Sequence, residues 1–144
     1  MDRDVYIYLR KTQAAFDFLE VVRHFESFGI CLEYPGTPYV RVSNEIGEDF
    51  EKPRDWLLAE LRSSPSVSFD WWIADRKDKD IYCRIRFERG ITILEFGLWV
   101  YEDVPWFLDC VFPLLKGYIS QEILLGCVID LQGEAPLYVD NCFL

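Results

Sequence analysis

The chain has 144 residues, and its 25 acidic and 15 basic side chains give a net charge of −10, with a single histidine. A strongly acidic surface repels phosphate backbones, so we expect no nucleic-acid partner. No segment approaches the roughly 20 apolar residues of a membrane-spanning helix. The charged start lacks the pattern of a signal peptide, so the expected location is the cytoplasm, without entry into a membrane.

The hydrophobic periodicities predict a mixture of strands and helices. In chain order, we expect a strand over residues 4–10, a helix over 13–28, strands over 30–34 and 39–43, an acidic loop over 44–52, a helix over 54–62, strands over 67–73, 81–88 and 91–101, a helix over 104–116, and strands over 123–131 and 137–139. Thr12 and Asp103 are suited to capping the first and third helices, and Gly29 is suited to ending the first. Pro113 should kink or shorten the third helix because proline lacks an N–H.

These elements predict a single α+β domain that spans residues 1–144, in the order β-α-β-β-α-β-β-β-α-β-β. Three consecutive strands with short connections indicate antiparallel pairing, and helices before and after them argue against a doubly wound parallel sheet. We therefore expect a mainly antiparallel, twisted sheet with about three helices.

The register of the central hairpin follows from its turn. Arg89-Gly90 joins two alternating strands, and a two-residue turn there places Glu88 opposite Ile91. The same register places Arg84 opposite Glu95 and Tyr82 opposite Gly97 on the polar face, while the other face is apolar on both strands.

The preceding strand should add its own apolar side chains to the same core. Pairing Trp71 with Cys83 achieves this and leaves residues 74–80 as a charged loop. The polar face would then carry Asp70, Arg84 and Glu95 in one row, with the arginine between two carboxylates.

This polar outer face of the sheet is the first candidate site. Tryptophan, tyrosine and arginine dominate the energetics of protein interfaces, so the face predicts a binding surface. Its candidate residues are Trp72, Tyr82, Arg84, Arg86, Glu95 and Trp99. The alternative is that a helix or the C-terminal segment covers the aromatic half and that the charges are ordinary surface pairs.

The acidic loop is the second candidate site, through Glu45, Glu48 and Asp49. It lacks the spacing and glycine of a calcium loop, so a solvated partner-binding loop is preferred over a metal site. His24 follows Glu20 by one helical turn, which indicates an exposed ion pair and not a catalytic base. The sequence contains no phosphate-binding loop, nucleophile motif or histidine pair, so we expect no catalytic residues, metal or cofactor.

The cysteines predict buried, reduced thiols. They are not spaced for zinc binding or for a redox pair, and most of them lie in apolar segments. They are Cys31, Cys83, Cys110, Cys127 and Cys142.

These observations favour a non-enzymatic acidic domain that binds a basic protein. In size, charge and lack of a catalytic constellation, the chain resembles immunity-type and antitoxin-type inhibitors, which implies a basic toxin or effector as the partner. Two alternatives stay open. One is a small regulatory or assembly subunit that forms a homodimer through the aromatic sheet face, and the other is a carboxylate-based, metal-dependent enzyme.

Overall fold

The computed structural model describes residues 3–99, 103–131 and 137–139. In chain order its elements are β1 (Arg3–Leu9), α1 (Phe18–Glu26), β2 (Ile30–Cys31), β3 (Tyr39–Ser43), β4 (Asp49–Pro53), α2 (Arg54–Ser63), β5 (Ser66–Ile73), β6 (Arg76–Glu88), β7 (Ile91–Leu98), α3 (Asp103–Ser120), β8 (Leu124–Leu131) and β9 (Leu137–Val139). The predicted α+β class and element order are confirmed. One strand is additional to the predicted order, since β4 forms within the segment expected to be an acidic loop.

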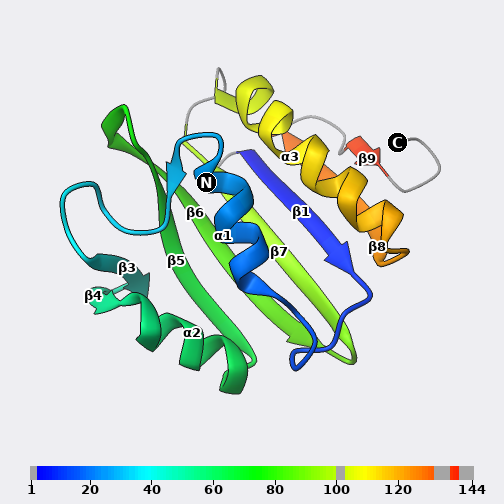
Figure 1. Cartoon of the computed structure of the whole chain (residues 1–144), viewed down its shortest axis with the longest axis horizontal. Coiled ribbons are helices and arrows are strands. Elements are labelled where there is room, and N and C mark those ends of the chain that lie inside the picture. Colours follow the sequence, from blue (N-terminus) through cyan, green and yellow to red (C-terminus); the bar gives the residue numbers. More distant parts are fainter. Residues whose placement is uncertain (1–2, 100–102, 132–136, 140–144) are drawn as a thin grey trace.

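All strands join one antiparallel sheet, in the spatial order β4-β3-β5-β6-β7-β1-β8-β9, with β2 paired to β5 beside β3 (Figure 1). The first strand of the chain therefore lies between β7 and β8, where it is hydrogen-bonded on both sides. This insertion ties the N-terminal segment to the last third of the chain and makes the sheet continuous.

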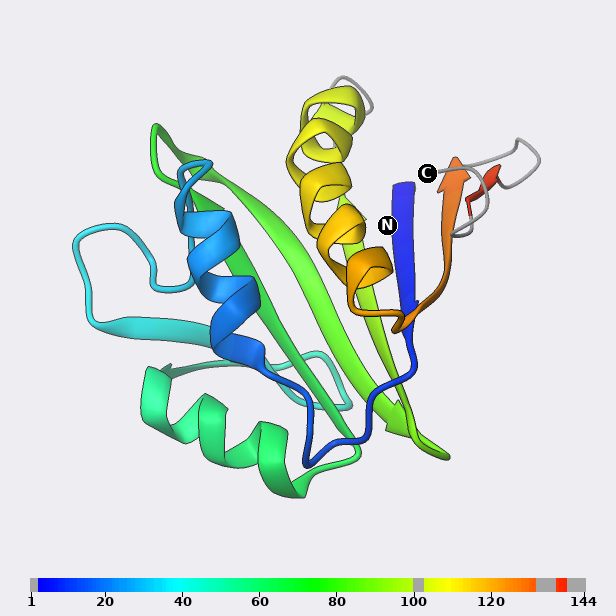
Figure 2. The ribbon, with the colours of Figure 1, turned by 45° about the vertical axis from the view of Figure 1, so that its right-hand side comes forward.

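The three helices pack on one face of the sheet, where the core is rich in aromatic rings (Figure 2). Phe25 of α1 lies at its centre. Its ring is 5.0 Å from that of Trp71, 5.6 Å from that of Phe96 and 6.0 Å from that of Phe107 on α3. The separations and tilted or edge-on geometries are those that aromatic pairs prefer. One cluster thus joins α1, α3 and the two strands β5 and β7.

Helix α1 is shorter than predicted because its cap lies further along the chain. Asp17, not Thr12, is the N-cap, and its carboxylate accepts a hydrogen bond from the Glu20 amide at 3.3 Å. Thr12 instead begins a turn, in which its carbonyl accepts hydrogen bonds from the amides of Ala15 and Phe16. Thr12 and Asp17 are both suitable capping residues. A start at Asp17 is favoured because the first two buried side chains of the helix, Phe18 and Val21, follow it directly.

Helix α3 extends beyond both of its predicted ends, from Asp103 to Ser120. The expectation that Pro113 shortens this helix is wrong. The proline ring is exposed, while Leu114, Leu115 and Tyr118 beyond it are buried against the sheet. Burial of these three side chains offsets the hydrogen bond that proline removes.

His24 connects α1 to α3 and does not form the expected exposed pair with Glu20. Its Nε2–H donates to the backbone carbonyl of Cys110 at 2.7 Å, and its ring lies 5.2 Å from that of Phe28. The histidine is therefore half-buried between the two helices and bridges them through this hydrogen bond.

The central hairpin has the predicted register, but the neighbouring pair of strands does not. Glu88 pairs with Ile91, Arg84 with Glu95, and Tyr82 with Gly97, as expected. The predicted pairing of Trp71 with Cys83 is wrong, because Trp71 pairs with Ile81.

The error is a shift of two residues. Strand β6 begins at Arg76, so the predicted loop over residues 74–80 is largely strand, and the tight turn pulls β6 back along β5. Because two residues is one full period of a strand, every side chain keeps its predicted face while its neighbours change.

We predict that His24→Ala lowers the free energy of unfolding by about 1–2 kcal/mol, since the substitution removes the partly buried hydrogen bond between α1 and α3 and the ring contacts with Phe25 and Phe28. Urea unfolding followed by circular dichroism measures this. His24→Gln keeps an N–H donor and should recover part of the loss. Wild-type stability of His24→Ala would show that this hydrogen bond does not hold the helices together.

Candidate functional site

The outer face of the sheet is the face opposite the three helices. Its charged side chains form ion pairs with side chains on neighbouring strands. Arg84 donates to Glu95 across the β6–β7 pair at 3.1 Å, as the predicted register requires. On its other side, however, Arg84 faces Ser68 and not Asp70. The predicted row of Asp70, Arg84 and Glu95 is therefore wrong at its first member.

Asp70 instead pairs with an arginine that the sequence analysis did not connect to it. Arg41 on β3 donates to Asp70 through Nε and to Asp80 through Nη2, the latter at 2.8 Å. The guanidinium also lies 4.6 Å from the Trp72 ring centroid, and the Tyr34 ring packs edge-on against that tryptophan. This cluster binds β3 to β5 and β6 by charge, hydrogen bonds and stacking.

Asp70 is only 5% exposed, and its burial affects its ionisation. Burial raises the pKa of Asp70 to about 6, although the hydrogen bond and charge of Arg41 act in the opposite direction. Ionisation of Asp70 is therefore less favourable in the folded protein than in the unfolded chain, although Arg41 is its partner.

A cleft opens where the sheet divides between β3 and β5. These two strands pair only at Val42–Phe69 and Ser43–Ser68, after which β3 turns away into β4. The resulting cavity has a volume of about 600 Å³, within the range of small-molecule and side-chain pockets. Its walls are Val42, Ser43, Asn44, Glu45, Phe50, Lys52, Trp56, Glu60, Ser66, Val67, Ser68, Tyr82 and Arg84.

The cleft is rich in hydrogen-bonding groups and balanced in charge. Lys52 lies over the Trp56 ring at 5.4 Å, and the Ser68 and Tyr82 hydroxyls are 3.1 Å apart. The Glu60 carboxylate accepts a hydrogen bond from Ser64 at 2.6 Å. No histidine or cysteine is among the lining residues.

The β3–β4 hairpin beside the cleft has an ordered, acidic tip. The Asn44 side-chain oxygen accepts hydrogen bonds from the amides of Ile46 and Glu48, at 3.1 and 2.9 Å. Gly47 has a φ of 84°, a left-handed conformation that glycine adopts without strain. These features hold the backbone of the tip, which carries the exposed Glu45, Ile46 and Glu48 side chains, in one turn conformation.

Several predicted site residues do lie together. Tyr82, Arg84 and Glu45 line the cleft, Glu95 pairs with Arg84 next to it, and Glu48 and Asp49 lie on the adjoining hairpin.

The others lie elsewhere on the sheet. Trp72 is 6% exposed beneath Arg41, so it has little surface for a partner. Trp99 is 60% exposed beyond the end of β7, and Arg86 pairs with Glu88 at the opposite end of the face.

The apolar part of this region was not predicted from the sequence. Ile46, Phe50 and Trp56 are all exposed, at 80%, 45% and 36%, and lie on the hairpin and on α2. A signal was present, since the apolar side chains of Ile46 and Phe50 interrupt an otherwise polar segment.

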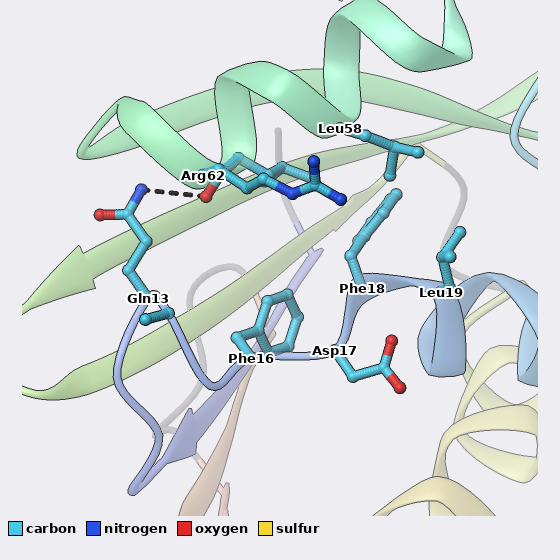
Figure 3. Close-up of a pocket in the computed structure, with 9 residues that line it drawn as sticks. Gln13, Phe16, Asp17, Phe18, Leu19, Leu58 and Arg62 are labelled. Atoms are coloured by element: carbon cyan, nitrogen blue, oxygen red, sulfur yellow. Dashed lines mark hydrogen bonds between the residues drawn. The ribbon is translucent and has the colours of Figure 1, made fainter.

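A second cavity, of about 400 Å³, lies between α2 and the segment that leads into α1 (Figure 3). At one end of it, the Gln13 side chain donates to the carbonyls of Leu61 and Ser64, at 2.9 and 2.8 Å. Gln13 thus satisfies carbonyls at the C-terminal end of α2, which lack partners within the helix. The remaining walls are mainly apolar, which indicates an imperfect fit between two helices.

The described cysteines have the chemistry of core residues. Cys83, Cys110 and Cys127 are buried, and no disulfide links any of the four cysteines in the described ranges. Burial raises the pKa of the Cys83 thiol, and it raises that of Cys127 to about 11. These groups are neutral thiols at physiological pH and are poor nucleophiles.

Comparison of the chain with family models, with curated proteins and with solved structures gives no significant match. Among residues 3–99, 103–131 and 137–139, no cluster of three or more His, Cys, Asp or Glu side chains is arranged to hold a metal ion. Within the same ranges, no helix has both the length and the apolar character needed to cross a membrane.

Double-mutant cycles test the revised pairing on the outer face. We expect Arg41→Ala and Asp70→Ala to couple by roughly 1–3 kcal/mol of unfolding free energy, since they are in direct contact and Asp70 is buried. Arg84→Ala and Glu95→Ala should couple by about 0.5–1 kcal/mol because Arg84 is more exposed. The cycle between Asp70 and Arg84 is the control, and a coupling there above that of Asp70 with Arg41 would contradict the register.

The raised pKa of Asp70 predicts a pH dependence of stability with a definite sign. Between about pH 4 and 6 the folded state holds a proton on Asp70 more tightly than the unfolded chain does, so this residue lowers stability as pH rises through that range. The free energy of unfolding of Asp70→Asn should therefore rise by roughly 1–3 kcal/mol relative to that of wild type between pH 4 and 7. Above that range it should rise no further.

Urea unfolding at a series of pH values measures this difference. Ser68→Ala, a neutral change on the same face of β5, should leave the shape of the wild-type pH profile unchanged. Parallel profiles for wild type and Asp70→Asn would contradict the raised pKa.

Proposed function

We propose that this chain is a non-enzymatic protein-binding domain that uses the acidic β3–β4 hairpin to engage a basic protein. In its most concrete form, the partner is a toxin or effector whose basic active site the hairpin blocks, as in immunity-type and antitoxin-type inhibitors. The proposed location is the cytoplasm, where such an inhibitor protects the cell that produces it.

The observation that carries the proposal is the tip of the hairpin. Ile46, 80% exposed, lies between the exposed carboxylates of Glu45 and Glu48, in a turn ordered by Asn44. An apolar anchor within a charged rim is the usual anatomy of a protein-binding hot spot. Order in the free protein supports tight binding, because fewer rotamers and backbone states are lost on association.

The charge of the hairpin supports a basic partner. Residues 44–53 contain four carboxylates and one lysine, and all four carboxylate side chains are exposed. That lysine, Lys52, lies over the Trp56 ring. The negative potential at the tip therefore has little local compensation, and it would speed encounter with a positive surface.

The adjoining cleft adds contact area to this surface. Phe50 and Trp56 provide exposed aromatic area at its mouth, and Tyr82 and the serine hydroxyls provide polar groups inside it. Aromatic rings combined with hydroxyl groups suit recognition of another protein's side chains.

A charge-reversal experiment tests the proposal. Glu45→Lys/Glu48→Lys should abolish capture of the basic partner from a lysate of the source cells, measured by quantitative mass spectrometry against wild type. The matched control is Asp75→Lys/Asp109→Lys, which changes the net charge equally at two exposed positions away from the hairpin and should retain the partner. Binding should also weaken with added salt, because exposed charges are screened beyond about 10 Å at 0.1 M.

Two results would contradict the proposal. One is equal capture of the basic protein by the hairpin variant and the control. The other is tight, salt-resistant binding of the wild-type chain to a DNA or RNA oligonucleotide.

A further inference from the structure

Strand β4 is the last strand at one side of the sheet, and its outer edge is unpaired within the described ranges. The hydrogen-bond pattern identifies which backbone groups face outward. The amide of Asn44 donates to the carbonyl of Glu48, which makes Ser43–Asp49 a pair that does not exchange hydrogen bonds. Alternation then directs the N–H and C=O groups of Phe50 and Lys52 toward β3.

The backbone groups that face outward are therefore those of Asp49 and Glu51, followed by the carbonyl of Pro53. No described residue donates to or accepts from the backbone of Asp49 or Glu51 on this side. Every side chain of β4 is exposed except that of Lys52, which is half-buried. Proline has no N–H, so the row of free donors ends at Pro53.

The side chains of β4 divide by charge between the two faces. Asp49 and Glu51 lie opposite Ser43 and Arg41, on the outer face of the sheet. Phe50 and Lys52 lie opposite buried valines, on the side of the helices. An added strand would therefore meet carboxylates on one face and an exposed aromatic ring on the other.

The carboxylate of Glu51 is available to a partner, although an arginine lies directly opposite it. The Arg41 guanidinium is held by Asp70 and Asp80, and no cation in the part of the chain that the structure describes forms an ion pair with Glu51. The cluster that fixes β3 thus leaves the Glu51 carboxylate at the sheet edge without an ion-pair partner among the described residues.

We propose that the partner binds this edge by adding an extended, antiparallel strand in which basic residues alternate with apolar ones. The basic side chains would lie beside Asp49 and Glu51, and an apolar side chain would pack on Phe50. Main-chain hydrogen bonds provide affinity in this mode, and alternate side chains provide specificity. The inference rests on the proposed function, because it names how the basic partner meets the acidic hairpin.

A second copy of the chain is a poorer occupant of the same edge. Antiparallel pairing of β4 with itself would place Asp49 and Glu51 of one copy beside the same carboxylates of the other, on the same face. Like charges opposite each other destabilise strand pairing, and charged edge strands commonly prevent self-association in this way.

The test uses the ¹⁵N-labelled full chain and a seven-residue peptide of alternating lysine and valine. On binding, the amides of Asp49 and Glu51 should shift in the NMR spectrum and exchange with solvent at least tenfold more slowly. The amides of Phe50 and Lys52, already bonded to β3, should change little and serve as internal controls.

Modified peptides make the test specific for strand pairing. In the proposed pairing, the lysine residues of the peptide direct their N–H groups at β4, because they lie opposite Asp49 and Glu51. N-methylation at the lysines should abolish binding, whereas N-methylation at the valines should preserve it. Replacing the lysines with glutamates should also abolish binding.

The proposal is overturned if the unmodified peptide gives no protection at Asp49 and Glu51, if both methylated peptides bind equally, or if the free chain already forms a dimer with those amides protected. These results are distinct from failure of the proposed function. A chain whose partner capture is lost in Glu45→Lys/Glu48→Lys, but which shows no protection at β4, would keep the function and exclude strand addition.

Discussion

The constraint on which the rest of this structure depends is that all three described helices cover the same face of the sheet. The outer face therefore satisfies its charged groups mainly by pairing along the sheet, and the described helices reach it only at the cleft, through Trp56 and Glu60 of α2. Arg84 with Glu95 and Arg41 with Asp70 and Asp80 are the result. The edge of the sheet at β4 is unpaired among the described residues, and both proposals are located there.

The sequence was informative wherever a local rule decided the structure. The Arg89-Gly90 turn determined the β6–β7 register, and alternation assigned every central side chain to its observed face. The β5–β6 register was predicted wrongly because the predicted and the observed registers differ by two residues and place the same side chains on the same face. Only the length of the turn at residues 74–75 separates them, and a charged segment does not specify that length.

The candidate site was only partly predictable for a similar reason. Tyr82, Arg84 and Glu45 were identified by residue type, and they do line one cleft. Their grouping arises because β3 leaves β5 after two residue pairs, which is a tertiary event without a sequence signature. Arg41 was overlooked because its partners lie 29 and 39 residues away, beyond any local pattern. The burial of Trp72 follows from the same arginine.

The narrow attachment of β3 to β5 also has a consequence for the local stability of the domain. Two residue pairs and the charged cluster hold the β3–β4 hairpin to the sheet, whereas β5, β6, β7 and β1 are paired along most of their length. Segments with few long-range contacts open at lower free energy than the domain as a whole. We therefore expect the amides of the hairpin to exchange through local opening at a lower free energy than the amides of β6 and β7.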